Sequence, residues 1–291
     1  MNTAFPTFIN GTTPFYPAKS PRRNPSLGNS RYELSNGLSH YNALQVDLTQ
    51  RFSHNLQFRA NYTYAKSLDT HSSSFLANSG VGGTTTTMFP ENPRFDYGRS
   101  NFDVTSKFSS NFSYQLPFGR GQAYMPDVNG IANALIGGWQ VNGIFSAQSG
   151  FPFTPLVGFN QSGSGDTRNP DRVSFSPAFS GPVIVGKQTE WFDPHAFALP
   201  TAGFYGNAGR DILEGPGLLS VDASLFKTFH IVERVNLQFR TEFFNFINHP
   251  NLGLPFVGTF TSSGGISPSA GLINYTATSS RQIQFGMKLN W

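Results

Sequence analysis

Residues 102 to 116, FDVTSKFSSNFSYQL, alternate between polar and apolar side chains along the whole segment. Every odd position from Asp103 to Gln115 is polar, and the even positions are apolar apart from Ser106 and Ser110. A period of two is the repeat of a β-strand with one polar and one apolar face. The segment is much longer than the roughly 5 or 6 residues of a usual globular strand. A strand of this length needs a large apolar neighbour.

The same alternation recurs along the chain and predicts about eight long strands. Residues 53 to 55 form a short connection between two of them, which indicates a β-hairpin. Before that hairpin, Asn36 and Gly37 form a turn dipeptide that tolerates positive φ. Together with 102 to 116, the predicted strands are residues 30–34, 41–52, 56–66, 137–148, 218–229, 234–244 and 281–291.

The last of these segments, RQIQFGMKLNW, brings the sequence to its end inside a predicted strand. Its polar positions alternate with five apolar ones, which predicts a closing strand with one apolar face turned toward lipid. The apolar positions are Ile283, Phe285, Met287, Leu289 and Trp291.

The connections between the predicted strands differ in length. Those at about 67–101, 150–217 and 247–279 are long, whereas those at 53–55 and 230–233 are short and the one at about 117–136 is intermediate. In an up-and-down meander alternate connections lie at the same end, so the long loops share one rim. Outer-membrane barrels show this asymmetry. We therefore predict an all-β, antiparallel up-and-down transmembrane β-barrel over 27–291, preceded by an irregular segment, 1–26.

A soluble β-sandwich is the alternative fold, because alternation by itself shows only that one face is buried. Strand length, the one-sided loops and the aromatic residues of the apolar faces favour the barrel. Long links rich in Gly, Ser, Thr and Pro also count against a compact soluble domain.

Composition narrows the class of protein further. Charged residues make up 12% of the chain and aromatic residues 15%, with a net charge of +4. The charge is not gathered into a basic patch, so we do not expect a nucleic-acid partner. No apolar run reaches the roughly 18 residues of a membrane helix, so membrane contact has to come from strands. The first residues lack the pattern of a signal peptide, which leaves two readings: the protein is not exported, or Met1 is not its natural start.

Catalytic, cofactor and metal motifs are missing from the sequence. There is no cysteine, and the six histidines are scattered without metal-ligand spacing. Asp166, Asn169 and Asp171 are weak candidates for touching a calcium ion, because the spacing and closing Glu of an EF-hand are absent. We expect no enzyme activity, no cofactor and no metal. Arg234, Arg240 and Glu242 lie on a predicted polar face and are candidate lumen charges, which can pair or guide a solute.

Several segments, taken together and in order, resemble the C-terminal barrel of Oar-like TonB-dependent receptors of Gram-negative bacteria. The resemblance runs from about Asn24 to Trp291. It is carried by YNALQVDLTQRFSHNLQFRANYTYAKSLD, NPRFDYGRSNFDVTSKFSSNFSYQLPFGRG, GGWQVNGIFSAQSGFPFTP, FYGNAGRDILEGPGLLSVDASLFKTFHI and LQFRTEFFNFINHPNLG.

The resemblance implies a barrel of about 22 strands with a plugged lumen. It implies a location in the cell outer membrane of a Gram-negative bacterium and uptake of a scarce or large solute, driven by a TonB complex that contacts an N-terminal region missing from this sequence. It also implies that the last strand, Ile283 to Trp291, is read by the outer-membrane assembly machinery. The expected partners are thus outer-membrane lipid, that machinery, TonB and an unknown solute.

Eight predicted strands are fewer than the resemblance implies, so we expect a partial, C-terminal section of a larger barrel, with a curved open sheet and two exposed edges. Thr105, Ser106 and Lys107 also stand where such receptors often carry a more basic run. Two other functions stay open: a passive porin-like or adhesive outer-membrane barrel whose long loops bind a surface or partner, and a soluble β-rich binding module or hydrolase.

Overall fold

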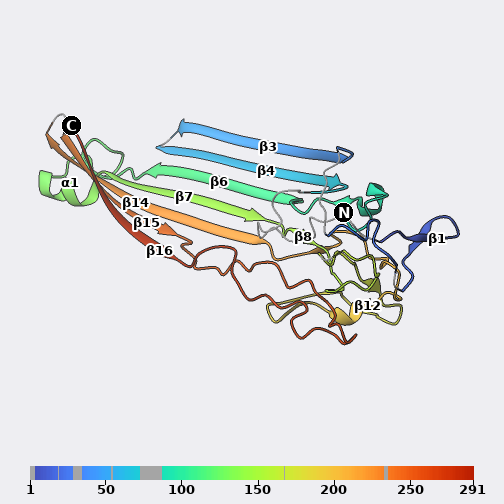
Figure 1. Ribbon diagram of the computed structural model, residues 1–291. Coiled ribbons are helices and arrows are strands. Elements are labelled where there is room, and N and C mark those ends of the chain that lie inside the picture. Colours follow the sequence, from blue (N-terminus) through green and yellow to red (C-terminus); the bar gives the residue numbers. More distant parts are fainter. Residues whose placement is uncertain are drawn as a thin grey trace.

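The computed structural model describes residues 4–18, 20–28, 35–53, 55–72, 87–166, 168–232 and 235–291. One large antiparallel sheet dominates the fold (Figure 1). Its strands are joined in the order β16-β15-β14-β7-β6-β4-β3, so each long strand pairs with the one before it along the chain. The seven long strands are β3 (Ser39–Ser53), β4 (Leu56–Asp69), β6 (Ser106–Gln115), β7 (Trp139–Gln148), β14 (Leu218–Val232), β15 (Val235–Phe244) and β16 (Gln282–Asn290).

One predicted strand begins later in the structure than expected, and another falls on residues that the structure does not describe. The eighth member of the sheet is the short β5 (Gly98–Arg99), which pairs with the end of β4. The strand predicted at 30–34 lies outside the described residues. The strand predicted at 102–116 begins only at Ser106, because Asp103 turns back to accept a hydrogen bond from the Ser67 N–H at 2.7 Å.

The register of the sheet gives it one apolar and one polar face. Across β6, β7 and β14, for example, Tyr114 lies opposite Val141, and Val141 lies opposite Leu225. One residue further along, Ser113 lies opposite Asn142, and Asn142 opposite Ser224. The alternation in the sequence is therefore carried across strands as two continuous surfaces.

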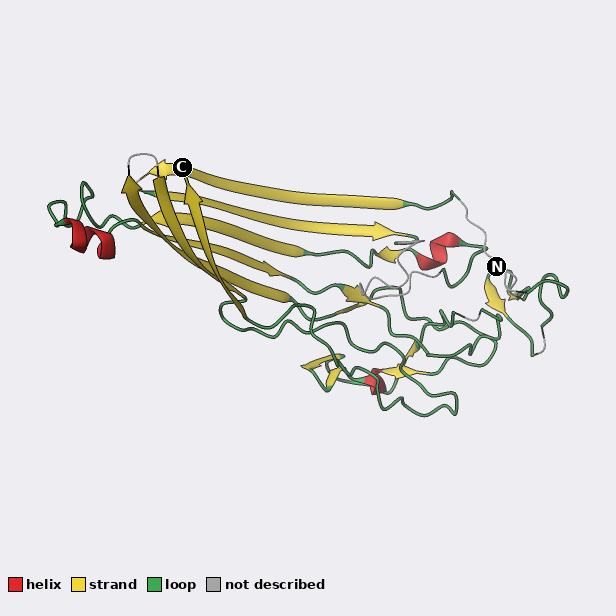
Figure 2. Ribbon diagram, turned by 60° about the vertical axis from the view of Figure 1, so that its left-hand side comes forward, coloured by secondary structure: helices red, strands yellow, loops and turns green. Residues whose placement is uncertain are grey.

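The sheet is open. β3 and β16 lie at its two edges, and within the described residues each pairs with one neighbour along its length. The views in Figures 1 and 2 show the strands as a curved wall. No second long-stranded sheet packs on this wall in the described part of the chain, where the other sheets have two short strands each. The sandwich alternative is therefore not the observed architecture.

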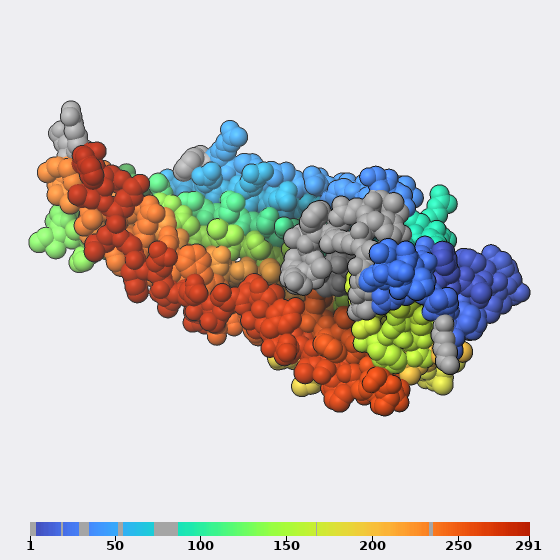
Figure 3. Space-filling model, viewed as in Figure 1, coloured from blue at the N-terminus to red at the C-terminus, as the bar shows by residue number. Residues whose placement is uncertain are grey.

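The long connections gather at one end of the wall. Residues 70–105, 149–217 and 245–281 link strands at the end marked by the N-terminus, and we call the described residues of these outer loops the cap (Figures 1 and 3). Its short elements are the strands β8 (Pro152–Phe153), β9 (Ser174–Phe175), β10 (Ile184–Lys187), β11 (Glu190–Phe192), β12 (Phe197–Ala198) and β13 (Leu213–Glu214), and the 3-10 turns Pro93–Asp96 and Pro194–Ala196. The N-terminal hairpin of β1 (Thr7–Ile9) and β2 (Thr13–Phe15) joins it, with Tyr16 buried.

The opposite end carries the short connections. β3 and β4 are joined at this end, as are β14 and β15, each pair through only two residues. The link from β6 to β7 also lies here, and it contains the only α-helix of the described residues, α1 (Gly130–Ile136). Figure 1 shows α1 and the C-terminus at this end. We call it the short-turn rim.

The hydrophobic core lies in the cap and not in the wall. Phe153, Val157 and Phe192 are fully buried there, and Phe192 packs against Phe153 and Phe197 with ring centroids 5.8 and 6.0 Å apart. On the apolar face of the wall, by contrast, side chains such as Leu44 and Phe285 are largely exposed. The wall therefore exposes a large apolar surface, which is stable only against another apolar phase.

Candidate functional site: the polar face and the cap

Short polar side chains form a connected surface on the polar face of the wall. The Gln140 amide donates to Ser113 Oγ at 2.8 Å and to Asn142 Oδ1 at 2.7 Å, and Asn142 Nδ2 donates to Ser224 Oγ at 3.2 Å. Near the edge of the sheet, Arg59 pairs with Asp47 on the adjacent strand at 2.9 Å. This face offers hydroxyls and amides to a polar solute, and charged side chains such as Lys107, Asp222 and Lys288 share it by register.

Arg240 and Glu242, two of the predicted lumen charges, lie on this polar face. Glu242 is opposite Ser224 on one side and Gln284 on the other. The Arg240 Nε–H donates to Gln238 Oε1 at 2.7 Å, and the guanidinium lies 4.8 Å from the centre of the Phe226 ring. Arg240 and Glu242 therefore form no ion pair with each other, because Arg240 is held by Gln238 and Phe226. Arg234 lies outside the described residues.

Phe226 is a polar-face residue that the sequence pattern did not single out. It follows Leu225 of the apolar face, and its register with Gln140 and Arg240 places it among polar neighbours. Cation–π contact with Arg240 gives this aromatic ring a role there. The signal in the sequence was its position in the alternation, which puts it one residue out of phase with Val221, Ala223 and Leu225 of the same strand.

β16 presents the apolar residues of the predicted assembly signal as expected from their alternation. Ile283, Phe285, Met287 and Leu289 lie opposite Phe243, Thr241, Phe239 and Leu237, all on the apolar face. The ring of Phe285 stacks on that of Phe239 with centroids 6.2 Å apart. Trp291 follows the last residue of the strand and is 89% exposed. Recognition of this strand by assembly machinery stays a prediction.

One buried ion pair fastens the cap to the outer end of the wall, and another joins two loops within the cap. Arg210 binds the Asp69 carboxylate at the end of β4, and Arg172 Nη1 lies 2.9 Å from Asp96 Oδ1. All four side chains are at most 5% exposed. Burying a charge is costly unless it is paired and hydrogen-bonded, so each arginine stabilises a loop only while its partner stays in place. Sequence reasoning missed these pairs because the partners are far apart along the chain.

Asp211 is the most unusual acid of the cap. Its backbone has a φ of 53°, and its Oδ1 accepts a hydrogen bond from Thr154 Oγ1 at 2.8 Å. Its Oδ2 is buried and has no hydrogen-bond partner within the described residues. Burial raises the pKa of Asp211 to about 7, and the positive charge of Arg210 opposes that rise. The carboxyl group thus takes up a proton near neutral pH.

The three residues considered for calcium do not form a ligand set. Asp171 accepts hydrogen bonds from the N–H and hydroxyl of Ser162 at 2.6 and 3.0 Å. Asp166 pairs with the guanidinium of Arg168 at 2.6 Å, and Asn169 has a left-handed backbone with a φ of 52°. Over the part of the chain that the structure describes, no group of three His, Asp or Glu side chains could hold a metal ion.

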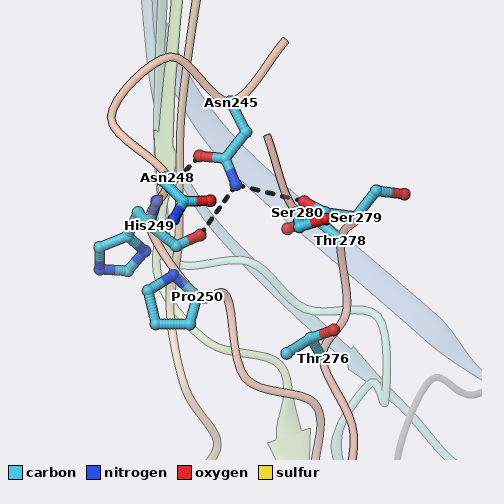
Figure 4. A pocket seen from close by; sticks show the side chains of 8 residues that line it. All are labelled: Asn245, Asn248, His249, Pro250, Thr276, Thr278, Ser279 and Ser280. Atoms are coloured by element: carbon cyan, nitrogen blue, oxygen red, sulfur yellow. Dashed lines mark hydrogen bonds between the residues drawn. The ribbon is translucent and has the colours of Figure 1, made fainter. Parts of the chain in front are cut away.

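A pocket of about 280 Å³ lies between residues 245–250 and 276–280 at the base of the last outer loop (Figure 4). Asn245 closes the loop by donating from Nδ2 to the carbonyls of His249 and Ser279 at 3.1 and 3.2 Å. Nearby, Asn251 makes a reciprocal pair of hydrogen bonds with the backbone of Leu219 at 2.7 and 2.9 Å. The side chains of Asn245 and Asn251 thus hold the backbone of the loop in place, which gives these two residues of the NFINHPN segment a structural role.

Comparison with protein families decides the class of the chain. A family model described as an outer membrane beta barrel domain matches residues 1–284. The chain belongs to this family. It is therefore an outer-membrane protein of Gram-negative bacteria, and the wall is a section of a β-barrel whose apolar face meets lipid.

Two further searches, of curated proteins and of solved structures, found no match. Among the described residues, no helix has both the length and the apolar character needed to span a membrane.

Proposed function

We propose that this outer-membrane protein is the C-terminal barrel section of a TonB-dependent receptor that takes up a scarce or large solute without catalysing a reaction. The observation that carries the proposal is the open wall: seven long strands run in consecutive order, yet β3 and β16 do not meet in the described structure. Such a wall needs further strands to close, and a wide barrel leaves room for a plug.

The cap supports uptake of a specific solute. Long outer loops of a general pore need no core of their own, whereas here they bury Phe153 and Phe192 and fasten themselves with buried ion pairs. A packed cap above a polar wall suits capture of a solute followed by its passage along hydroxyl, amide and charged groups.

A passive porin-like or adhesive barrel is the second candidate. The observation that favours it is the exposure of aromatic side chains on the cap, such as Phe5, Phe8 and Phe175, which can contact a surface or a partner. A porin would pass small solutes without energy. An adhesin would bind through the cap and move nothing.

The deciding experiment starts from the genomic DNA upstream of Met1, where the receptor requires an in-frame plug and TonB box. The protein encoded there is reconstituted in vesicles, and two measurements follow: binding of a purified TonB C-terminal domain, and vesicle swelling in arabinose. If the protein is the receptor, it binds the TonB domain and the vesicles do not swell in arabinose. Swelling without TonB binding supports the porin, and neither result, combined with adhesion of cap-bearing vesicles to a surface, supports the adhesin.

A further inference from the structure

The link between β6 and β7 carries an apolar surface that the barrel does not use. Ile131 and Leu135 are 81% and 70% exposed on α1, and they are four residues apart, so they share one helix face. Earlier in the same link, the rings of Phe118 and Tyr124 pack together with centroids 5.6 Å apart and stay exposed. Leaving such a surface in water would cost free energy, because contact between apolar side chains and water is unfavourable.

The helix is held to the wall at its C-terminal end. The Trp139 indole N–H donates to the Leu135 carbonyl at 2.8 Å, and the Lys227 ammonium donates to the Gly137 carbonyl. The Thr228 N–H donates to the Gly138 carbonyl at 2.9 Å. Gly138 has a φ of 68°, and a Cβ there would meet Thr228 O at 2.5 Å, so only glycine allows this approach. The helix therefore has a fixed place on the short-turn rim.

Lys227 lies on the apolar face of the wall, opposite Trp139 and Phe239. Its ammonium is 5.2 Å from the Trp139 ring centre and 5.1 Å from that of Phe229, and the residue is only 3% exposed. A charged residue on the lipid face is tolerated near an interface and is costly at the bilayer centre. The two rings and the Gly137 carbonyl shield this charge from lipid. Because Gly137 directly follows α1, the Lys227 ammonium also holds α1 to the lipid-facing side of the sheet.

We propose that α1 and its flanking aromatics form an interfacial anchor that inserts Ile131 and Leu135 into the lipid leaflet at the short-turn rim. The lipid-facing wall and this surface are continuous through Trp139, which belongs to the apolar face and also caps α1. A short amphipathic helix lying in the interface buries its apolar face by about 5–10 Å below the headgroups. Lipid is therefore the occupant that the geometry favours over a protein partner.

The test uses the absence of native cysteine from this chain, which lets single cysteines be labelled one at a time. Ile131→Cys and Leu135→Cys carry a nitroxide label in the full protein, reconstituted in phosphatidylethanolamine–phosphatidylglycerol vesicles. The control is Asp127→Cys, an exposed polar position in the same link. We expect the labels at 131 and 135 to collide with oxygen in preference to a water-soluble nickel chelate, with a ratio severalfold above that at 127. Equal ratios at all three positions would overturn the proposal.

A protein partner at this surface predicts a different result, because labels at 131 and 135 would then be shielded from both oxygen and nickel. That outcome also overturns the proposal. Lys227→Met in the Leu135→Cys background provides a second variant: removing the ammonium frees the Gly137 carbonyl, so the label should shift toward water while the barrel stays protease-resistant. No shift would show that Lys227 does not position the anchor.

Discussion

The wall and the cap place the same apolar residue types in opposite positions, exposed on the wall and buried in the cap. Phe285 of the wall is 67% exposed, whereas Phe192 of the cap is fully buried. The wall turns its apolar side chains outward and its polar ones inward, which is stable only where lipid replaces water. The cap folds as a soluble domain does, around a packed core. The same chain therefore has its apolar side chains on the outside in the wall and on the inside in the cap, and the change occurs where the strands end.

Charge follows the same division. The wall pair Arg59–Asp47 is exposed, with side chains 61% and 40% accessible. The cap pairs Arg210–Asp69 and Arg172–Asp96 are almost fully buried. Exposed pairs contribute little to stability, and breaking a buried one leaves an unpaired charge. The cap is therefore the region that single charge changes can unfold.

The largest expected effect comes from Phe192→Ala in the cap core. Loss of a fully buried ring and the cavity that it leaves should cost the cap about 3–5 kcal/mol. Protease cleavage within 149–217, measured in outer-membrane vesicles, should become fast while the strands stay protected. The matched control is Phe285→Ala on the wall, which should leave cap cleavage unchanged. Equal sensitivity of the cap to both changes would contradict the division between wall and cap.

Arg210→Met tests the buried ion pairs. It leaves the Asp69 carboxylate buried without its partner, which should cost about 3 kcal/mol and open the cap to protease. Arg59→Met removes an exposed partner and should leave protease resistance as it is in the wild type. If Arg210→Met were as harmless as Arg59→Met, the cap would not depend on its link to β4.

The pH dependence of the cap should be smaller. The pKa of Asp211 is raised to about 7 in the folded cap, from an ordinary value of 3.8 when unfolded. Between these values the folded state binds the extra proton, so the cap loses stability as the pH rises from about 4 to about 7. Over the part of this range between pH 5 and pH 7, the loss from this group is on the order of 2–3 kcal/mol, at about 1.4 kcal/mol per pKa unit.

Burial also raises the pKa of Asp96 and of Asp171, so these two groups also make the cap less stable as the pH rises. Protease protection of the cap should therefore be stronger at pH 5 than at pH 8. Asp211→Asn should reduce this difference without abolishing it. A wild-type cap that is better protected at pH 8, or an unchanged pH slope in Asp211→Asn, would show that the proton does not reside on Asp211.

Deletion of Trp291 should have the smallest effect on cap stability and act on the wall alone. The predicted role of the last strand in assembly means that less protein should reach the outer membrane, while the protease pattern of the molecules that do arrive stays normal. Surface levels measured by whole-cell labelling provide the test, with Trp291→Phe as the control that keeps a terminal aromatic ring. Wild-type levels after deletion would count against an assembly signal.

Much of the wall was predictable from the sequence. The period of two in residues such as Phe108, Phe112 and Tyr114 reports which side of a strand each side chain occupies, and that geometry is local. The register then carried the same faces across neighbouring strands. The start of β6 at Ser106 was not predictable, because it depends on the distant hydrogen bond between Asp103 and Ser67.

The sequence by itself determined the strands, their two faces and the rim that carries the long loops, because alternation and connection length need no distant partner. Only the tertiary structure decided that the loops form a cap with its own core, that Arg210 meets Asp69, and that Lys227 holds α1 against the wall. Each of these contacts joins segments that are remote along the chain. Their formation depends on how the strands bring loop ends together, which no local pattern of residues encodes.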